Sequence, residues 1–424
     1  MAERAAETGG RGAAPAARPG ILASFALFRD GGYRAYWFVN FVYFLVFGAQ
    51  RFAFVLLVLE LSERAGLGGV IGFALGIPVF FITVPAGVWA DRLDRRKMVV
   101  ASLLAGAAVA GAVAGLWWAG AISVPVAMGL ALATGVVTAS VQPPLTSIVQ
   151  MIVPPERLTQ GIVLRTMGQN LAQFFGTAVG GLTIATLDYG GAFAVLAAGY
   201  LVGVVAMLAV RLPIAAPSTV ARPKMAEAAR EGLRFVFSDR ALRGLVIFSV
   251  ISGLFMLGPT FVLIPEIGRE KLQVGPGPNS MLLALLGVGM FCMSLFLLTR
   301  REVHRKGNWF VINLLFAGPL MILTGWSSSY WFTAVVMVLW GLGGGVYVNL
   351  NQTLIQTNTP NAMMGRVMSI YMLSIAGIIP LGSLLAGGGA AVIGADRYQM
   401  LSGAVLGLAA VWGFFTQREL RALD

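Results

Sequence analysis

The sequence predicts an all-α membrane protein with twelve transmembrane helices in two pseudo-symmetric six-helix bundles. Of its 424 residues, 58% are hydrophobic and only 11% are charged, which is too little charge to cover a globule of this size with a solvated surface. About twelve apolar runs are long enough to cross roughly 30 Å of hydrocarbon as helices. In addition, the second half of the chain repeats features of the first.

The apolar runs are continuous and rich in Leu, Ala, Gly and Val, whereas a barrel strand would alternate polar and apolar residues. Helices are therefore expected. They lie near residues 36–60, 67–90, 98–119, 122–150, 160–186, 190–211, 243–266, 279–299, 308–326, 330–356, 366–393 and 397–416.

The internal repeat appears when the chain is shifted by 206 positions, because glycines, a glutamine and a proline then fall on the same residue types. The glutamine and proline flank the same helix, loop and helix in each half. A duplicated bundle predicts a substrate site between the halves. The matched pairs are Gly135 with Gly341, Gln150 with Gln356, Pro154 with Pro360, Gly176 with Gly382 and Gly181 with Gly387.

The formal net charge is +12, but the positions of the basic residues favour a membrane topology over nucleic acid as a partner. Because Lys and Arg are retained on the cytoplasmic side during insertion, this asymmetry places both termini in the cytoplasm. Basic residues on that side lie in 4–34, 92–97, 211–243, 300–306 and 418–421 and at Arg157 and Arg366, while the opposite loops keep Arg64, Arg269, Lys271 and Arg397.

Five segments are expected from this pattern. Residues 1–29 form a disordered cytoplasmic tail, 30–212 the N-terminal bundle and 243–418 the C-terminal bundle, with a short tail at 419–424. Residues 213–242 form a cytoplasmic linker. Within it, apolar residues recur every four positions between residues 224 and 240, which predicts an amphipathic helix on the membrane surface.

A motif in the loop after the second helix identifies the family. It reads Gly87-Val-Trp-Ala-Asp91-Arg92-Leu-Asp-Arg95-Arg96-Lys. This resembles the signature loop of the major facilitator superfamily and implies the major facilitator fold in a bacterial-type cytoplasmic (inner) membrane. The resemblance further implies a conformational latch between the halves, made by Gly87, Asp91, Arg92, Arg95 and Arg96 in the outward-facing state. Alternatively, the basic residues only satisfy the positive-inside rule.

Other stretches narrow the branch. Gly176-Thr-Ala-Val-Gly180-Gly181 resembles the superfamily's exporter signature with Thr177 in place of proline, although small residues there also serve close helix packing. Residues 352–366 and 261–265 resemble the enterobactin exporter group. The resemblance implies proton-coupled export of a small organic molecule that is siderophore-like, anionic or drug-like, by alternating access.

Substrate-binding residues are expected among the polar groups inside helices, since burial in the bilayer is costly for them. Arg51 and Arg165 have no obvious carboxylate partner nearby, so a cavity holding an anionic or catechol-like group is predicted. Amides repeat at helical spacing beside them, although such amides also join helices together. The predicted set is Arg51, Gln142, Arg165, Gln169, Asn170, Gln173, Asn349 and Gln352.

Gating residues are expected where proline or glycine weakens a helix, namely Gly258, Pro259, Pro265, Gly377 and Pro380. Proton coupling needs a carboxylate that meets water alternately from each side. The candidates are Glu60 and Glu266 toward the outer ends of helices one and seven, both of which could also be merely interfacial.

The expected partners are a small-molecule substrate and membrane lipid, without nucleic acid, and a monomer is the simplest oligomeric state. No cofactor or metal is expected, and no phosphate-binding loop for ATP is present. An enzyme is disfavoured because one His and one Cys supply few catalytic groups. A lipid or lysolipid flippase of the same fold is the main alternative, and a sensor without transport is a further one.

Overall fold

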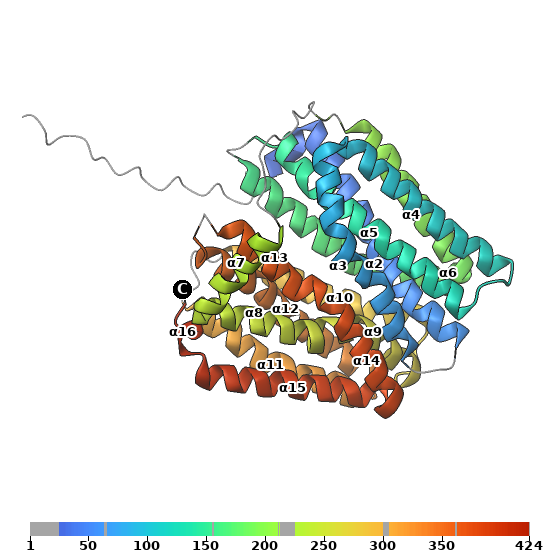
Figure 1. Cartoon of the computed structure of the whole chain (residues 1–424). Helices are drawn as coiled ribbons and strands as arrows, with labels where there is room; N and C mark the ends of the chain where they lie inside the picture. Colours follow the sequence, from blue (N-terminus) through green and yellow to red (C-terminus); the bar gives the residue numbers. More distant parts are fainter. Residues whose placement is uncertain are drawn as a thin grey trace, which may run out of the picture.

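The computed structural model describes residues 25–62, 66–154, 157–210, 212, 225–299, 305–360 and 363–423, and every element within them is helical. The helices form two bundles that lie side by side (Figure 1). The N-terminal bundle contains α2 (Gly31–Leu61), α3 (Leu67–Arg92), α4 (Arg95–Trp118), α5 (Val124–Ile152) and α6 (Leu158–Ala209). The predicted apolar runs and the observed helices agree closely.

Helix α6 is long enough to cross a membrane twice. Its 52 residues would extend about 78 Å as one straight helix, far more than the roughly 30 Å of hydrocarbon. The helix is interrupted at Asp188, whose φ of 64° and ψ of −173° are not helical. Residues 158–187 and 189–209 are therefore each long enough for one membrane span, which fits the two separate apolar runs of the sequence.

The C-terminal bundle contains two helices interrupted by π turns. The first consists of α8 (Arg240–Ser252), the π turn η3 (Gly253–Leu257) and α9 (Gly258–Glu270); the second consists of α13 (Met364–Met372), the π turn η4 (Leu373–Gly377) and α14 (Ile379–Ile393). Between and after them lie α10 (Pro276–Thr299), α11 (Lys306–Trp326), α12 (Tyr330–Thr357) and α15 (Ala395–Thr416).

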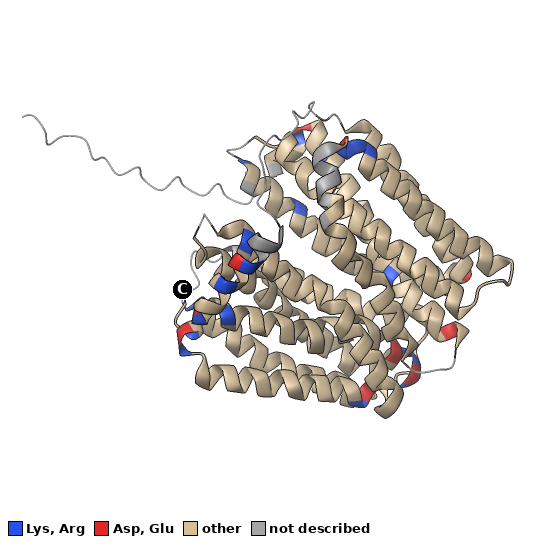
Figure 2. Ribbon diagram, viewed as in Figure 1, with Lys and Arg blue, Asp and Glu red and all other residues tan. Residues whose placement is uncertain are grey.

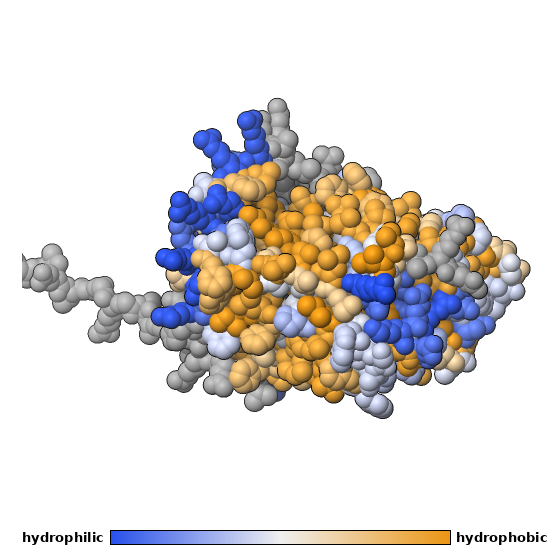
Figure 3. All heavy atoms as spheres, turned by 90° about the horizontal axis from the view of Figure 1, so that it is seen from below, coloured by the Kyte–Doolittle hydropathy of each residue, from blue (hydrophilic) through white to orange (hydrophobic). Residues whose placement is uncertain are grey.

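Ten helices within the described residues are long and apolar enough to cross a membrane. Counting α6 twice and adding the shorter apolar helix Leu67–Thr83 fits the expected twelve spans. Apolar side chains cover most of the surface between hydrophilic ends, as expected of a protein embedded in lipid (Figure 3).

Charged residues lie mostly at the two ends of the bundles, with Lys and Arg concentrated at the end near the C-terminus (Figure 2). Aspartates begin three helices at that end. Asp30 accepts from the Tyr33 N–H at 2.7 Å, Asp94 from the Arg96 N–H at 2.9 Å and Asp239 from the Leu242 N–H at 2.8 Å. These caps satisfy N–H groups that the first helical turn leaves without partners. The arrangement fits a cytoplasmic location of this end.

The segments outside the spans differ in part from the prediction. Residues 25–29, assigned to the disordered tail, form the 3-10 helix η1 (Phe25–Arg29), because Leu27 is buried and the Phe28 ring packs on Trp37. The C-terminal tail contains α16 (Arg418–Arg421), which is held by the buried Leu420. In the linker, residues 225–238 form the helix α7 (Met225–Ser238), and residues 213–224 lie outside the described part.

Glycines related by the 206-residue offset make equivalent helix contacts in the two halves. An added Cβ at Gly176 would overlap the Leu45 carbonyl on α2, and one at Gly382 would overlap the Gly253 carbonyl on η3. Both glycines therefore let a helix approach the first helix of its own bundle. The repeat seen in the sequence corresponds to an equivalent packing geometry.

Candidate functional site

A cavity of about 400 Å³ lies between the two bundles. It is bounded by the first span of α6 from the N-terminal bundle and by α10 and α12 from the C-terminal bundle. All three helices contribute the part nearest the end assigned to the cytoplasm. The lining residues are Ile162, Val163, Thr166, Met167, Asn170, Leu171, Phe174, Gly287, Met290, Phe291, Ser294, Val348, Asn349, Gln352, Thr353 and Gln356.

The cavity wall combines apolar surface with a few amides, and none of its lining residues is ionisable. Asn349 is held in place, because its Nδ2 donates to Ser294 Oγ at 2.9 Å and to the Gly345 carbonyl at 2.7 Å. Among the described residues, the side chains of Asn170 and Gln352 have no hydrogen-bond partner. These two amides, one from each bundle, are therefore available to a ligand.

Phe174 closes the outer end of this cavity. Its side chain occupies the space beside Gly287, where an added Cβ would overlap the Phe174 ring. The Phe174 ring also stacks on Phe261 of α9, with centroids 6.2 Å apart. Arg51 continues this chain of contacts, because its guanidinium carbon lies 4.0 Å from the centroid of the Phe261 ring. A cation–π contact of this kind joins the two bundles across the cavity's outer end.

Three of the eight predicted substrate-binding residues line the cavity, namely Asn170, Asn349 and Gln352. Arg51, Gln142, Arg165, Gln169 and Gln173 do not. The Arg165 side chain instead contacts its own helix, where its Nη1 donates to Gln169 Oε1 at 3.4 Å, and the Arg165 backbone carbonyl accepts from Asn40 Nδ2 of α2 at 3.4 Å. The Arg165 Nε is buried and has no hydrogen-bond partner in the part of the chain that the structure describes.

The outer parts of the bundles are in direct contact, which closes that side of the protein. Helix α3 packs on α14 and the first span of α6 packs on α10. We call these two contacts the outer closure. Glycines permit both: an added Cβ at Gly69 would overlap Gly387 and Ser383, and one at Gly181 would overlap Ser280. The cavity lies between the outer closure and the end of the protein where the basic residues gather.

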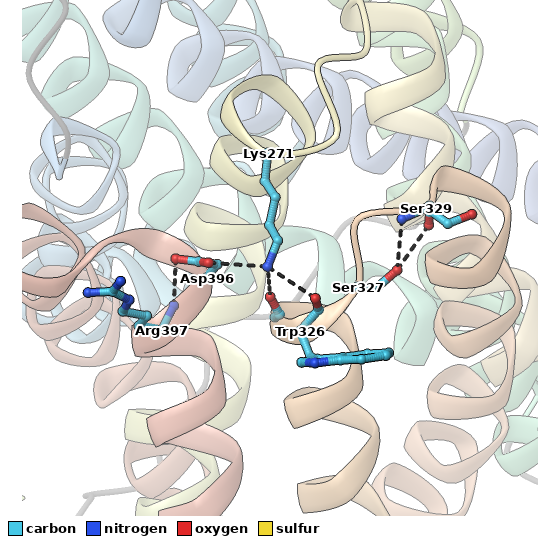
Figure 4. Close-up of polar contacts among 7 residues, drawn as sticks. Lys271, Trp326, Ser327, Ser329, Asp396 and Arg397 are labelled. Carbon is cyan, nitrogen blue, oxygen red and sulfur yellow. Dashed lines mark hydrogen bonds and ion pairs between the residues drawn. The ribbon is translucent and has the colours of Figure 1, made fainter.

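The outer end of α9 is fixed to its own bundle by Lys271 (Figure 4). The ammonium donates to the Gly325 carbonyl at 2.5 Å and to the Trp326 carbonyl at 3.2 Å, at the end of α11, and forms an ion pair with Asp396 of α15 at 3.2 Å. A cation is favourable at a helix C-terminus, where carbonyls lack partners. The end of α9 is thereby held against α11 and α15.

The predicted gating residues lie at the π turns and at the outer closure. Pro259 has no N–H, so it cannot continue the α-helical hydrogen-bond pattern, and the Gly258 N–H donates to the Gly253 carbonyl five residues earlier. Gly377 ends the second π turn, and Pro380 packs against Gly76 of α3. The Pro265 carbonyl accepts from Asn279 at 2.7 Å. Their gating role stays a prediction.

The two coupling candidates occupy different environments. Glu60 is exposed and forms an ion pair of 3.5 Å with Arg269 from the other bundle. Glu266 is fully buried, and its Oε1 accepts from the Gly66 N–H at 3.3 Å, also across the bundles. Its other oxygen, Oε2, has no hydrogen-bond partner among the described residues.

The predicted latch lies only partly within the described residues. The backbone of Gly87, Asp91 and Arg92 belongs to α3, and the side chains of Asp91 and Arg92 lie outside the described part. Arg95 Nη1 contacts Met151 Sδ at 2.8 Å, and Arg96 Nη2 donates to the Leu208 carbonyl. Both contacts are within the N-terminal bundle, and a latch in the outward-facing state stays a prediction.

Several cavity residues were missed from the sequence. Met290, Phe291 and Ser294 lie on α10, whose apolar run gives no sign of which side faces a cavity. For Gln356 the sequence does contain an indication, because the internal repeat pairs it with Gln150. Because Gln356 lies near a helix end, however, the sequence favours helix packing for it at least as strongly as substrate binding.

The architecture is that of a multi-pass membrane transporter: two helical bundles are in contact at their outer ends and enclose a cavity between them. Residues 22–424 match the model of the family described as transmembrane secretion effector, and the chain belongs to this family of major facilitator transporters. Over 355 residues it is 29% identical to the multidrug efflux pump Tap of Mycobacterium bovis, covering 80% of this chain and 82% of Tap. This places the chain among transporters and not among enzymes, as predicted.

Two other comparisons agree with this assignment. The enterobactin exporter EntS of Shigella boydii is 23% identical over 359 residues, covering 84% of each chain. Among solved structures, a bacterial homologue of the human lysosomal transporter Spinster, in an inward-facing and occupied conformation, superimposes with a TM-score of 0.72 at 15% identity, covering 92% of this chain and 98% of that one. The latter confirms the major facilitator fold.

Proposed function

We propose that this protein is a secondary active exporter that moves an amphipathic small molecule out of the cytoplasm by alternating access. The observation that carries this proposal is the cavity between the bundles, which lies on the cytoplasmic side of the outer closure. A molecule bound there contacts both bundles. Rocking of the bundles would close the cavity behind it and open the outer side.

The cavity wall favours a drug-like or siderophore-like molecule with a large apolar surface. Met167, Met290 and Phe291 supply adaptable and aromatic contacts, and the amides of Asn170 and Gln352 supply hydrogen bonds. The names of the relatives, a multidrug efflux pump and an enterobactin exporter, support export of such molecules. An anionic substrate would additionally require the Arg165 side chain to leave Gln169 and turn toward the cavity.

We assign proton coupling to Glu266 in preference to Glu60. Glu266 lies between the bundles at the outer closure, so opening of that side would transfer it from a dry to a wet environment. A buried carboxylate with one oxygen unsatisfied is costly, which links its proton to the conformation of the protein. Glu60 is already exposed and ion-paired, so the same movement would change its surroundings less.

Transport in proteoliposomes with an imposed proton gradient tests the proposal. Erythromycin, enterobactin and a fluorescent phospholipid serve as three separate probes. Gradient-driven movement of erythromycin or enterobactin that collapses with a protonophore is expected. Movement of only the phospholipid would instead identify a flippase, and movement insensitive to the protonophore would contradict proton coupling.

Two variants tie the activity to the cavity. Gln352→Leu removes an amide that faces the cavity, while Gln150→Leu makes the same change at an exposed position outside it. Transport should be weakened by the first and unchanged by the second. If the two substitutions changed transport equally, the cavity would no longer support the proposal.

A further inference from the structure

A groove runs along the outside of the N-terminal bundle, between α2 and the second span of α6. It consists of two hollows of about 670 and 410 Å³ that share Phe38 and Ala206 and are therefore continuous. No residue of the groove belongs to the cavity between the bundles. The remaining lining residues are Gly31, Gly32, Arg34, Ala35 and Ala209 at one end and Ala198, Leu201, Val202 and Val205 at the other.

The part of the groove along residues 198–206 is apolar and faces away from the interior of the protein. Phe38 is 44% exposed and Val205 is 69% exposed, and Leu201 and Val202 lie beside them with similar exposure. Large apolar side chains exposed on membrane-spanning helices contact lipid. The small side chains of Ala198 and Ala206 leave the space between these larger ones unfilled.

The other end of the groove is basic and lies at the cytoplasmic ends of both helices. Arg34 lines it and is exposed, and no carboxylate pairs with it among the described residues. The nearest acidic residue in the sequence, Asp30, already accepts the Tyr33 N–H in capping α2. Arg96 adds a second cation close by, since its guanidinium contacts the Leu208 carbonyl next to Ala209.

We propose that this groove binds one anionic phospholipid of the cytoplasmic leaflet. The phosphate of the headgroup lies at Arg34, and an acyl chain lies along Phe38, Val202 and Val205. The groove begins at the level of the headgroups and continues into the apolar part of the protein, where lipid is the available occupant. Positive charge at the membrane surface selects an anionic headgroup over a zwitterionic one. This inference does not depend on the transported substrate.

Lipid retention by the purified full-length protein tests the proposal. Native mass spectrometry compares phosphatidylglycerol with phosphatidylcholine of the same acyl chains. One phosphatidylglycerol should be retained preferentially. Arg34→Gln should lower its retention by about fivefold, the factor that corresponds to about 1 kcal/mol per basic residue at the surface. Arg418→Gln, an exposed arginine on the other bundle, should have no effect.

A second variant tests the apolar part. Ala206→Leu fills the groove and should reduce retention of both lipids, whereas Ala108→Leu, at an exposed position on α4, should not. Equal retention of the two lipids by the wild type, or wild-type retention in Arg34→Gln and Ala206→Leu, would overturn the proposal. Displacement of the lipid by inorganic phosphate alone would also overturn it, because a phosphate site would not need the apolar groove.

Fluorescence quenching in membranes gives a second test that does not depend on the folding of Arg34→Gln or Ala206→Leu. In a Cys292→Ser background, Val205→Cys carries a bimane label in the groove. Brominated phosphatidylglycerol should quench this label more strongly than brominated phosphatidylcholine at the same mole fraction. Equal quenching by the two lipids would argue against a site in the groove.

Discussion

Replacing Gly69 with alanine should open the outer side of the protein. An added Cβ at Gly69 would lie 2.5 Å from the Cα of Gly387 and closer still to the Ser383 carbonyl oxygen. Carbon atoms pack best at about 3.5–4.0 Å, so α3 and α14 would have to separate by about 1 Å. Both neighbours are backbone atoms, and neither can rotate away.

The cost of this overlap can be estimated. Inserting one methyl group into a tightly packed site costs about 1–3 kcal/mol, and here only the conformation with the outer closure bears it. Because about 1.4 kcal/mol changes an equilibrium tenfold, the ratio of open to closed molecules should rise between roughly fivefold and 150-fold.

Labelling of a buried cysteine measures this ratio. In a Cys292→Ser background, Ser280→Cys places a reporter at the contact between α6 and α10, where Ser280 is 1% exposed. A membrane-impermeant maleimide added outside intact cells should label the reporter faster in Gly69→Ala. Gly111→Ala is the control, since its added Cβ meets nothing within 4 Å. Unchanged labelling in folded Gly69→Ala protein would refute the role of the outer closure.

Three further outcomes are expected. Glu266→Gln should abolish proton-driven transport in proteoliposomes but preserve exchange of labelled for unlabelled probe, whereas Glu60→Gln, which alters an exposed ion pair, should leave both nearly unchanged. Lys271→Met should lower the melting temperature by a few degrees, because three contacts worth about 1 kcal/mol each are lost, and an unchanged melting curve would contradict this. Gln352→Leu should weaken probe binding about tenfold in equilibrium dialysis, and Gln150→Leu should match the wild type.

The membrane spans could be predicted from the sequence because segments that lie in hydrocarbon must be continuously apolar, and because basic residues gather in the loops on one side of the membrane. The repeat was also readable, since a glycine such as Gly176 is needed wherever two helices approach closely. Close helix contacts require small residues, so the glycines at these positions occur in both halves and make the repeat visible in the sequence.

The site was less predictable. Met290 and Phe291 line the cavity, yet an apolar residue facing a cavity is chemically indistinguishable from one facing lipid. The sequence predicts Arg51 at the cavity because no carboxylate partner is obvious in the helices near it, but its guanidinium contacts the Phe261 ring of the other bundle. The sequence does not specify which helix from the other half approaches, so such contacts need the assembled fold.

The two π turns have a geometric consequence for α9 and α14. A π turn contains one residue more than an α turn, and each residue of an α-helix accounts for about 100° of rotation and 1.5 Å of rise. If η3 became α-helical, everything beyond it would rotate by about 100°. Glu266 would then leave the Gly66 N–H, and α9 would present a different face to the N-terminal bundle. The same conversion at η4 would turn Pro380 away from Gly76. Conversion of a π turn to an α turn would therefore rotate the outer segment of the helix and change its contacts, while the segment before the turn stays in place.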